Sequence, residues 1–283
     1  MPSKCYQPVA RRVPAPAPHV ERAGARTLAA VSLPAPLTLT GERTLPGIAD
    51  ENYWFRRHEA AYRALAPFLA GARVLEAGCG EGYGADLLAC GGAGPVTALD
   101  YDNLAVSHAA LRYPDLTMVM GDLQRLPFTA GGFDVVVHLQ TIEHLHNQQN
   151  FLADCSRVLR PAGTLAISTP NRLTFSPGQA APRNPFHTKE LCPAELSELL
   201  APCFEVTRML GLHHGPRLRR LERRLGPLVE TQQQGPPESW PQPVRAAVHR
   251  VRANDFLLSE DSSRRPLARS LDLLAIGYRR PRR

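Results

Sequence analysis

Short apolar runs alternate with amphipathic segments along the middle of this 283-residue chain. The apolar runs have the length and composition of buried strands, and they cover residues 73–77, 96–100, 118–122, 132–137, 164–169, 204–209 and 270–277. Segments that suit helices lie at residues 51–62, 85–89, 102–112, 147–159 and 193–200. Strands and helices that alternate in this way predict an α/β fold, in which helices cover both faces of a parallel sheet.

The first apolar run breaks into a glycine-rich stretch that reads RVLEAGCGEGYG from Arg73 to Gly84. This pattern predicts a strand, a tight turn and a helix. Gly78, Gly80 and Gly82 allow positive φ angles and let a ligand lie against bare main chain. The stretch is therefore typical of a nucleotide-binding loop, although the glycines alone also fit dinucleotide binding.

Two acidic residues narrow the choice of ligand. Glu76 precedes the first glycine, and a carboxylate there disfavours a pyrophosphate but suits a ligand with an ammonium group, such as S-adenosylmethionine. Asp100 ends the second apolar run, where a carboxylate can accept hydrogen bonds from both ribose hydroxyls. A Gly-Asp pair, Gly121-Asp122, ends the third run.

The order of these motifs resembles that of the class I S-adenosylmethionine-dependent methyltransferases, from about Val74 to Thr169. The resemblance implies a Rossmann-like, seven-stranded, mostly parallel sheet whose last strand runs antiparallel between the fifth and sixth. It also implies that the glycine loop holds the methionine part of the cofactor, the second-strand acid the ribose, and the Gly-Asp acid the adenine. The residues assigned to the cofactor are Glu76, Gly78, Cys79, Gly80, Asp100, Tyr101, Asp122, Leu123 and Gln140. A dehydrogenase or a catalytically silent binding module is the competing interpretation.

The segment after the fourth strand, from Val137 to Asn147, carries the candidate catalytic residues. Methyl transfer to a hydroxyl requires alignment of the acceptor and removal of its proton, for which an imidazole is suited. His144 is the favoured base, Glu143 is expected to orient or polarise a histidine, and His187 in a later loop is the alternative base. His144 and His146 could also bind a metal, but no third ligand is evident, so the metal ligands stay unknown.

Acceptor contacts are expected from aromatic and polar residues outside the cofactor motifs. Tyr53, Trp54 and Phe55 are consecutive on a predicted helix, and because neighbouring helix positions diverge by about 100°, at least one of them should face a ligand or partner. The long loop after the fifth strand is of the type that carries specificity. The residues predicted to bind the acceptor are Tyr53, Trp54, His146, Asn171 and His213.

Segments outside the core motifs resemble a narrower group, the actinobacterial 1-O-methyltransferases of methylmannose polysaccharide synthesis. These segments are residues 40–44, 51–62, 171–178, 184–187, 211–218 and 270–276. The resemblance implies that the acceptor is a sugar hydroxyl, the 1-OH of a short 3-O-methylated mannoside, with a histidine base and a magnesium requirement. A C- or O-methyltransferase for a quinone or another small metabolite is the alternative, and a homodimer is a further option.

Charge and composition limit the partners. The net charge is +7, but residues 47–216 hold twelve basic and seventeen acidic side chains, so the excess of arginine lies in the flanks. An acidic core argues against nucleic acid as a partner. No apolar run approaches the ~18 residues of a membrane span, and the six cysteines form no C-x-x-C pair. We therefore expect a cytoplasmic protein with reduced thiols and no membrane span.

The ends of the chain differ from its middle in composition. Residues 1–38 are rich in proline, alanine and arginine and are predicted to be a disordered tail. Residues 39–278 are predicted to form one catalytic domain with a variable insertion at about 211–268. Residues 279–283 are predicted to be a basic tail.

Overall fold

The structure is a computed structural model that describes residue 37 and residues 43–281. Most of the predicted tail at residues 1–38 lies outside the described residues, as do the last two residues of the predicted basic tail. Cys79, Cys155, Cys192 and Cys203 are free thiols. No helix in that part is long and apolar enough to cross a membrane.

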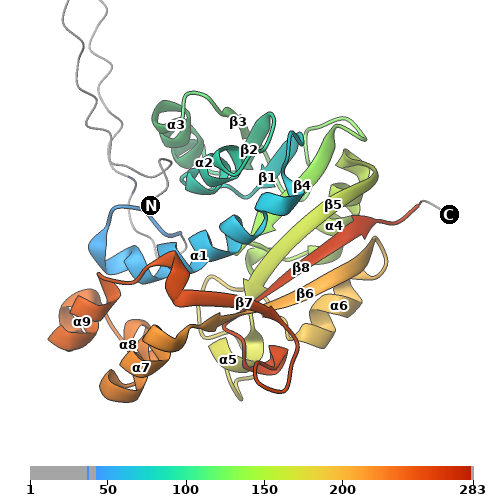
Figure 1. Ribbon diagram of the computed structural model, residues 1–283. Helices are drawn as coiled ribbons and strands as arrows, with labels where there is room; N and C mark the ends of the chain where they lie inside the picture. Colours follow the sequence, from blue (N-terminus) through green and yellow to red (C-terminus); the bar gives the residue numbers. More distant parts are fainter. Residues whose placement is uncertain (1–36, 38–42, 282–283) are drawn as a thin grey trace, which may run out of the picture.

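An eight-stranded sheet forms the centre of the fold, in the order β3-β2-β1-β4-β5-β8-β6-β7 (Figure 1). Its strands are β1 (Val74–Ala77), β2 (Val96–Asp100), β3 (Thr117–Met120), β4 (Phe133–Leu139), β5 (Leu159–Pro170), β6 (Phe204–His214), β7 (Phe256–Glu260) and β8 (Asp272–Arg279). The strands from β3 to β5 pair in parallel, and β8 runs antiparallel between β5 and β6. The predicted Rossmann-like α/β fold is confirmed, including its antiparallel last strand.

The far edge of the sheet differs from the prediction. β6 continues to His214 rather than ending at Met209, and its extension pairs with β7. β7 lies inside the segment that the sequence predicts only as a variable insertion. Its sequence, FLLSE, does not alternate between apolar and polar positions, so its strand character depends on pairing with β6.

Helices cover both faces of the sheet (Figure 1). They are α1 (Asn52–Ala64), α2 (Tyr83–Cys90), α3 (Asn103–Arg112), α4 (Gln148–Val158), α5 (Arg172–Phe175), α6 (Pro193–Leu200), α7 (Pro216–Leu225), α8 (Leu228–Gln233) and α9 (Gln242–Val248). Short 3₁₀ helices are η1 (Ala49–Glu51), η2 (Ala66–Phe68), η3 (Ile142–His144), η4 (Pro237–Ser239), η5 (Ala253–Asp255) and η6 (Leu267–Arg269).

The core forms two layers because successive strand side chains point to opposite faces. Val74 of β1 belongs to the apolar cluster under α1 and α2. Its neighbour Leu75 belongs to the cluster under α4 and α6. The sheet is therefore buried on both sides, as a parallel sheet requires.

A third apolar cluster joins α7, α8 and α9 to the N-terminal part of α1, and these helices lie together at one end of the molecule in Figure 1. Tyr53 from α1 packs there with residues of α7, α8, α9 and β7. A buried ion pair also ties α1 to β8, since Arg57 Nη2 lies 2.5 Å from Asp272 Oδ1. The helix before the glycine loop is thus fixed to the segment predicted as an insertion.

Candidate active site

A cavity of about 670 Å³, called the main cavity below, lies at the carboxyl ends of β1, β2 and β4. This edge of a parallel sheet is where ligands bind in such folds. Side chains from α1, from the loop at 183–187 and from the segment 232–240 complete its wall. Seven of the nine residues predicted for the cofactor line it: Gly78, Cys79, Gly80, Asp100, Tyr101, Leu123 and Gln140.

The glycine loop has the backbone that its sequence predicts. Gly78 and Gly80 have φ angles of 84° and 53°, in the left-handed region that favours glycine. A Cβ atom on Gly78 would lie 2.7 Å from Cγ2 of Thr141, so a larger residue would clash with the loop after β4. The N–H group of Gly80 donates to Oδ2 of Asp100 at 2.7 Å, which ties the loop to the end of β2.

Glu76 lies beneath this loop and is almost fully buried, at 1% exposure. Its Oε1 accepts a hydrogen bond of 2.5 Å from the hydroxyl of Tyr62. Its Oε2 is buried and has no hydrogen-bond partner in the described part of the chain. Burial raises the pKa of this carboxyl to about 8, although the hydrogen bond from Tyr62 opposes the shift. An unpartnered carboxylate oxygen of this kind fits a cationic ligand group.

Asp122 and Glu76 are the two predicted cofactor residues that do not line the cavity, and Asp122, unlike the buried Glu76, faces solvent. Its side chain is exposed, it does not line the main cavity, and its Oδ1 accepts a hydrogen bond from the N–H of Gln124. The next residue, Leu123, is buried and lines the cavity.

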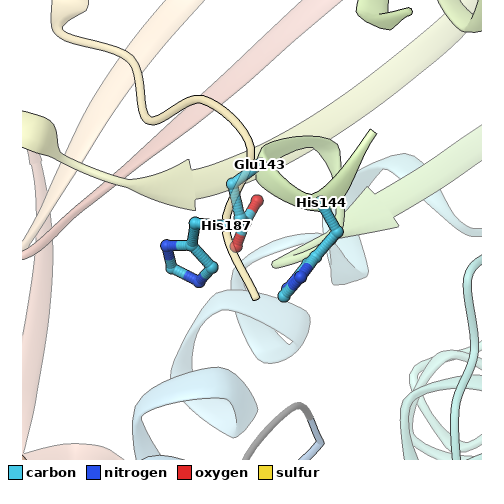
Figure 2. Close-up of side chains that lie close together, drawn as sticks. All are labelled: Glu143, His144 and His187. Atoms are coloured by element: carbon cyan, nitrogen blue, oxygen red, sulfur yellow. The ribbon is translucent and has the colours of Figure 1, made fainter. Parts of the chain in front are cut away.

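Three predicted catalytic residues come together on the wall of the main cavity. Glu143 and His144 lie in η3, directly after β4, and His187 lies in the loop before α6 (Figure 2). One potential ligand atom from each residue lies within 4.8 Å of the other two. The two imidazole rings meet edge to face, with 4.9 Å between their centroids.

The two histidines have different hydrogen bonds. His144 Nδ1 lies 2.9 Å from the carbonyl oxygen of Phe186, so this nitrogen carries a proton and Nε2 has the lone pair. His187 Nδ1 lies 2.8 Å from Glu190 Oε1, and its Nε2 lies 3.1 Å from Asn184 Nδ2. With the proton of His187 on Nδ1, where it is donated to Glu190, the lone pair on Nε2 accepts a hydrogen bond from the side-chain amide of Asn184.

Glu143 is buried at 1% exposure, and burial raises the pKa of its carboxyl to about 8. The hydroxyl of Thr169 donates to Oε2 of Glu143 at 3.0 Å. The main-chain carbonyl of Glu143 accepts hydrogen bonds from the N–H groups of Thr188 and Lys189, at 2.7 and 3.1 Å. These bonds hold the His187 loop against η3.

The remaining wall of the main cavity combines aromatic rings with polar side chains. The aromatic residues include Trp54, Phe175, Phe186 and Trp240, and the polar ones include Arg57, Arg183, Asn184, Gln232 and Gln233. The Arg57 guanidinium carbon lies 5.2 Å from the centroid of the Trp54 ring. This part of the cavity can contact both apolar faces and hydroxyl groups.

The structure does not bring the other residues predicted for acceptor binding to this cavity. Tyr53 is fully buried, and its hydroxyl lies 2.6 Å from His214 Nε2; because adjacent helix residues point in different directions, Trp54 reaches the cavity and Tyr53 does not. Asn171 is fully buried, and its amide donates to the carbonyl oxygens of Leu267 and Ser270. His146 is exposed outside the cavity. His213 lies in the extended β6 and lines a different cavity.

Sequence reasoning missed several residues that line the main cavity. His58 and Tyr62 follow Trp54 by four and eight positions and share its face of α1, and Glu51 lies three positions before Trp54, at the N-cap of the helix. The spacing from Trp54 could therefore have identified them. The residues between Gln232 and Trp240 carry no comparable signal, because only packing against α1 brings them to the site.

Comparison with known proteins agrees with this geometry. Residues 75–167 match the family model described as a methyltransferase domain. The chain is 51% identical over 252 residues to a probable S-adenosylmethionine-dependent methyltransferase of Mycolicibacterium smegmatis, covering 88% of this chain and 97% of that protein. It is 49% identical over 257 residues to a protein of the same description from Mycobacterium tuberculosis, covering 89% and 93% of the two chains.

The chain therefore belongs to the S-adenosylmethionine-dependent methyltransferases, and it is an enzyme of that family. The predicted cofactor class agrees with the site, since bare main chain at Gly78 and Gly80, the Asp100 carboxylate and the unpartnered Oε2 of Glu76 fit S-adenosylmethionine. A methyltransferase from Haloferax volcanii, solved in complex with the activator Trm112, has the same fold, with a TM-score of 0.57 and 18% identity over 83% of this chain and 94% of that one.

Proposed function

We propose that the protein methylates a hydroxyl group of a saccharide, with His144 as the general base. The observation that carries the proposal is the cluster of Glu143, His144 and His187 on the wall of the cavity that also contains the cofactor loop. S-adenosylmethionine supplies the methyl group when it is bound. The chain's own residues must then hold the acceptor oxygen in line and accept its proton.

His144 is better suited to accept that proton than His187. Its Nδ1–H donates to a backbone carbonyl, which fixes the ring and leaves the lone pair on Nε2. The hydrogen bonds of His187 to Glu190 and Asn184 occupy both of its ring nitrogens. We assign His187 a positioning role, because its ring packs against both His144 and Phe175.

Glu143 acts in this proposal by shaping the cluster. Its carbonyl holds the loop that carries His187, and its raised pKa leaves the carboxyl protonated near pH 7. A neutral carboxyl can donate a hydrogen bond to the acceptor or to a histidine.

The cavity lining supports a sugar as the acceptor. A sugar presents C–H faces that pack on aromatic rings such as Trp54 and Trp240, and hydroxyls that pair with polar groups such as Asn184 and Gln233. The finer prediction, the 1-OH of a short 3-O-methylated mannoside, rests on the resemblance of the segments outside the core motifs.

A quinone or another small aromatic metabolite is the second candidate acceptor. The aromatic rings of the wall favour it, whereas the buried Arg57 and the polar side chains opposite them favour a sugar. The mixed lining makes the saccharide the first choice.

The implied magnesium requirement finds no well-suited ligand set in the cluster. Magnesium prefers oxygen ligands, whereas Glu143, His144 and His187 offer one carboxylate and two imidazole nitrogens. That donor set suits a transition metal better. No step of the proposed reaction is assigned to a metal. A cytoplasmic location and a homodimer stay predictions from the sequence.

Transfer of labelled methyl groups from S-adenosylmethionine to a panel of short mannosides, glucosides and quinone precursors tests the proposal. The panel is run with and without magnesium, and with His144→Ala beside the unaltered enzyme. We expect labelled mannosides and little label with the variant. Labelling of quinones alone would overturn the saccharide assignment, and full activity of the variant with intact cofactor binding would overturn the base.

A further inference from the structure

A second cavity, of about 690 Å³, adjoins the main cavity, and both are lined by Arg57 and Phe175. Its other residues come from the end of β6, from α7 and α8, and from the segment 264–271. His213, which the sequence predicts as an acceptor contact, belongs to this wall. The volume is within the usual range for a small-molecule site.

Positive charge dominates the lining of the second cavity, which we call the arginine cavity. Besides Arg57, whose charge is offset by Asp272, its arginines are Arg219 and Arg223 from α7 and Arg264, Arg265 and Arg269 from the later segment. None of these five forms an ion pair with a carboxylate of the described residues. Two glutamates also line the cavity, which leaves a net of three positive charges, and one of these, Glu222, is engaged by His214 at 2.7 Å.

Two buried nitrogen atoms on this wall have no hydrogen-bond partner in the described residues. One is Nη1 of Arg57, whose other guanidinium nitrogens are held by Asp272 and by the carbonyl of Leu271. The other is Nε2 of His213. Burial lowers the pKa of His213, and the nearby charges of Arg265 and Arg219 lower it further. The guanidinium N–H donors of Arg57 Nη1, held in place by Asp272 and left without a partner, favour a ligand site beside them.

We propose that the arginine cavity binds the phosphate group of a small phosphorylated molecule. Guanidinium groups bind phosphate through paired N–H donors, and a doubly charged group offsets more of this charge than a single carboxylate does. The cavity volume of about 690 Å³ fits one small ligand rather than a nucleic-acid strand. The inference is independent of the acceptor's identity. The phosphate can belong to the acceptor itself, reaching past Arg57, or to a separate metabolite.

Calorimetric titration of the full-length, cofactor-loaded protein with pyrophosphate tests the site. Arg219→Gln/Arg223→Gln removes two charges from the cavity. Arg220→Gln/Arg224→Gln removes two charges from exposed positions of the same helix that do not line it, so net charge and helix are matched. We expect saturable binding that weakens about tenfold or more in the first variant and less than about twofold in the second. Absence of saturable binding, or equal loss in both variants, would overturn the proposal.

A second titration distinguishes the two sources of phosphate. Phe186 lines only the main cavity of the two, so Phe186→Ala should leave pyrophosphate binding unchanged. If that variant weakens binding of mannose 1-phosphate, the phosphate belongs to a ligand that spans both cavities. If it leaves both probes unaffected, the phosphate belongs to a separate ligand. In both cases the Arg219→Gln/Arg223→Gln variant must bind pyrophosphate and mannose 1-phosphate more weakly than the unaltered protein does. Unchanged binding of either probe would contradict the proposed site.

Discussion

The two sides of the main cavity are built in different ways. The cofactor side consists of loops that directly follow β1, β2, β3 and β4, and its contacts come from main chain and from carboxylates near it. The acceptor side combines side chains from α1, from residues 175–187 and from residues 232–240. The first side depends on local turn geometry, and the second depends on tertiary packing. Substitutions should therefore separate cofactor binding from turnover.

The largest expected effect is at His144, which follows β4 and meets His187 of the acceptor side. His144→Ala should lower kcat by roughly 10²–10⁴-fold, because proton removal from the acceptor is lost, while calorimetry shows unchanged S-adenosylmethionine binding. His187→Ala should lower kcat less and alter the pH profile. His146→Ala is the control, because His146 lies outside the cavity. A profile for His144→Ala that matches that of His146→Ala would contradict the assignment.

On the cofactor side, Gly78→Ala should weaken S-adenosylmethionine binding by about 100-fold. Alanine disfavours the left-handed backbone by roughly 1–2 kcal/mol, and its Cβ would also meet Thr141. Gly178→Ala is the matched control, since Gly178 also has a positive φ of 69° but an added Cβ would meet nothing within 4 Å. Equal loss of cofactor affinity in both variants would show that the effect is general destabilisation.

The ionisation of Glu76 should make the free energy of unfolding depend on pH. Its folded-state pKa of about 8 exceeds the ordinary value of 4.5, so between these values the folded protein binds more protons than the unfolded chain. The free energy of unfolding should fall as pH rises through this window, and Glu76→Gln should flatten that dependence.

Cofactor binding should also release a proton from Glu76. At pH 7 an ammonium group beside Oε2 favours the ionised carboxyl, so binding should release about one proton. Calorimetry in buffers of different ionisation enthalpy measures this number. We expect Glu76→Gln to release none and to bind about tenfold more weakly. Proton release that persists in the variant would assign it to another group.

The smallest effects come from adjacent residues of α1. Tyr53→Phe should cost about 1 kcal/mol of stability, because it removes the hydrogen bond to His214, and it should leave KM unchanged. Trp54→Phe should raise the acceptor KM a few-fold at nearly constant stability. Chemical denaturation and steady-state kinetics measure the two quantities. A change in KM for Tyr53→Phe would show that the acceptor site extends to the third apolar cluster.

The contrast between local turn geometry and tertiary packing also explains how much of the structure the sequence predicted. The fold followed from alternating apolar runs, and the cofactor side from glycines and acids at strand ends, because each signal is local. Tyr53, Asn171 and His213 were predicted to bind the acceptor from residue type alone. Their hydrogen bonds and burial involve residues far away in the chain, such as His214 and Ser270. β7 escaped prediction for the same reason, since it is defined by the strand beside it.

One helix, α1, carries both Trp54, on the acceptor wall, and Tyr62, whose hydroxyl donates to Glu76 beneath the cofactor loop. Eight residues of helix span about 12 Å, and the helix transmits a displacement over that length as a nearly rigid rod. An engineer who reshapes the acceptor pocket by shifting α1 would therefore also disturb the hydrogen bond to Glu76. Redesign of substrate specificity should instead begin with the loop at 183–187, which can change while α1 stays in place.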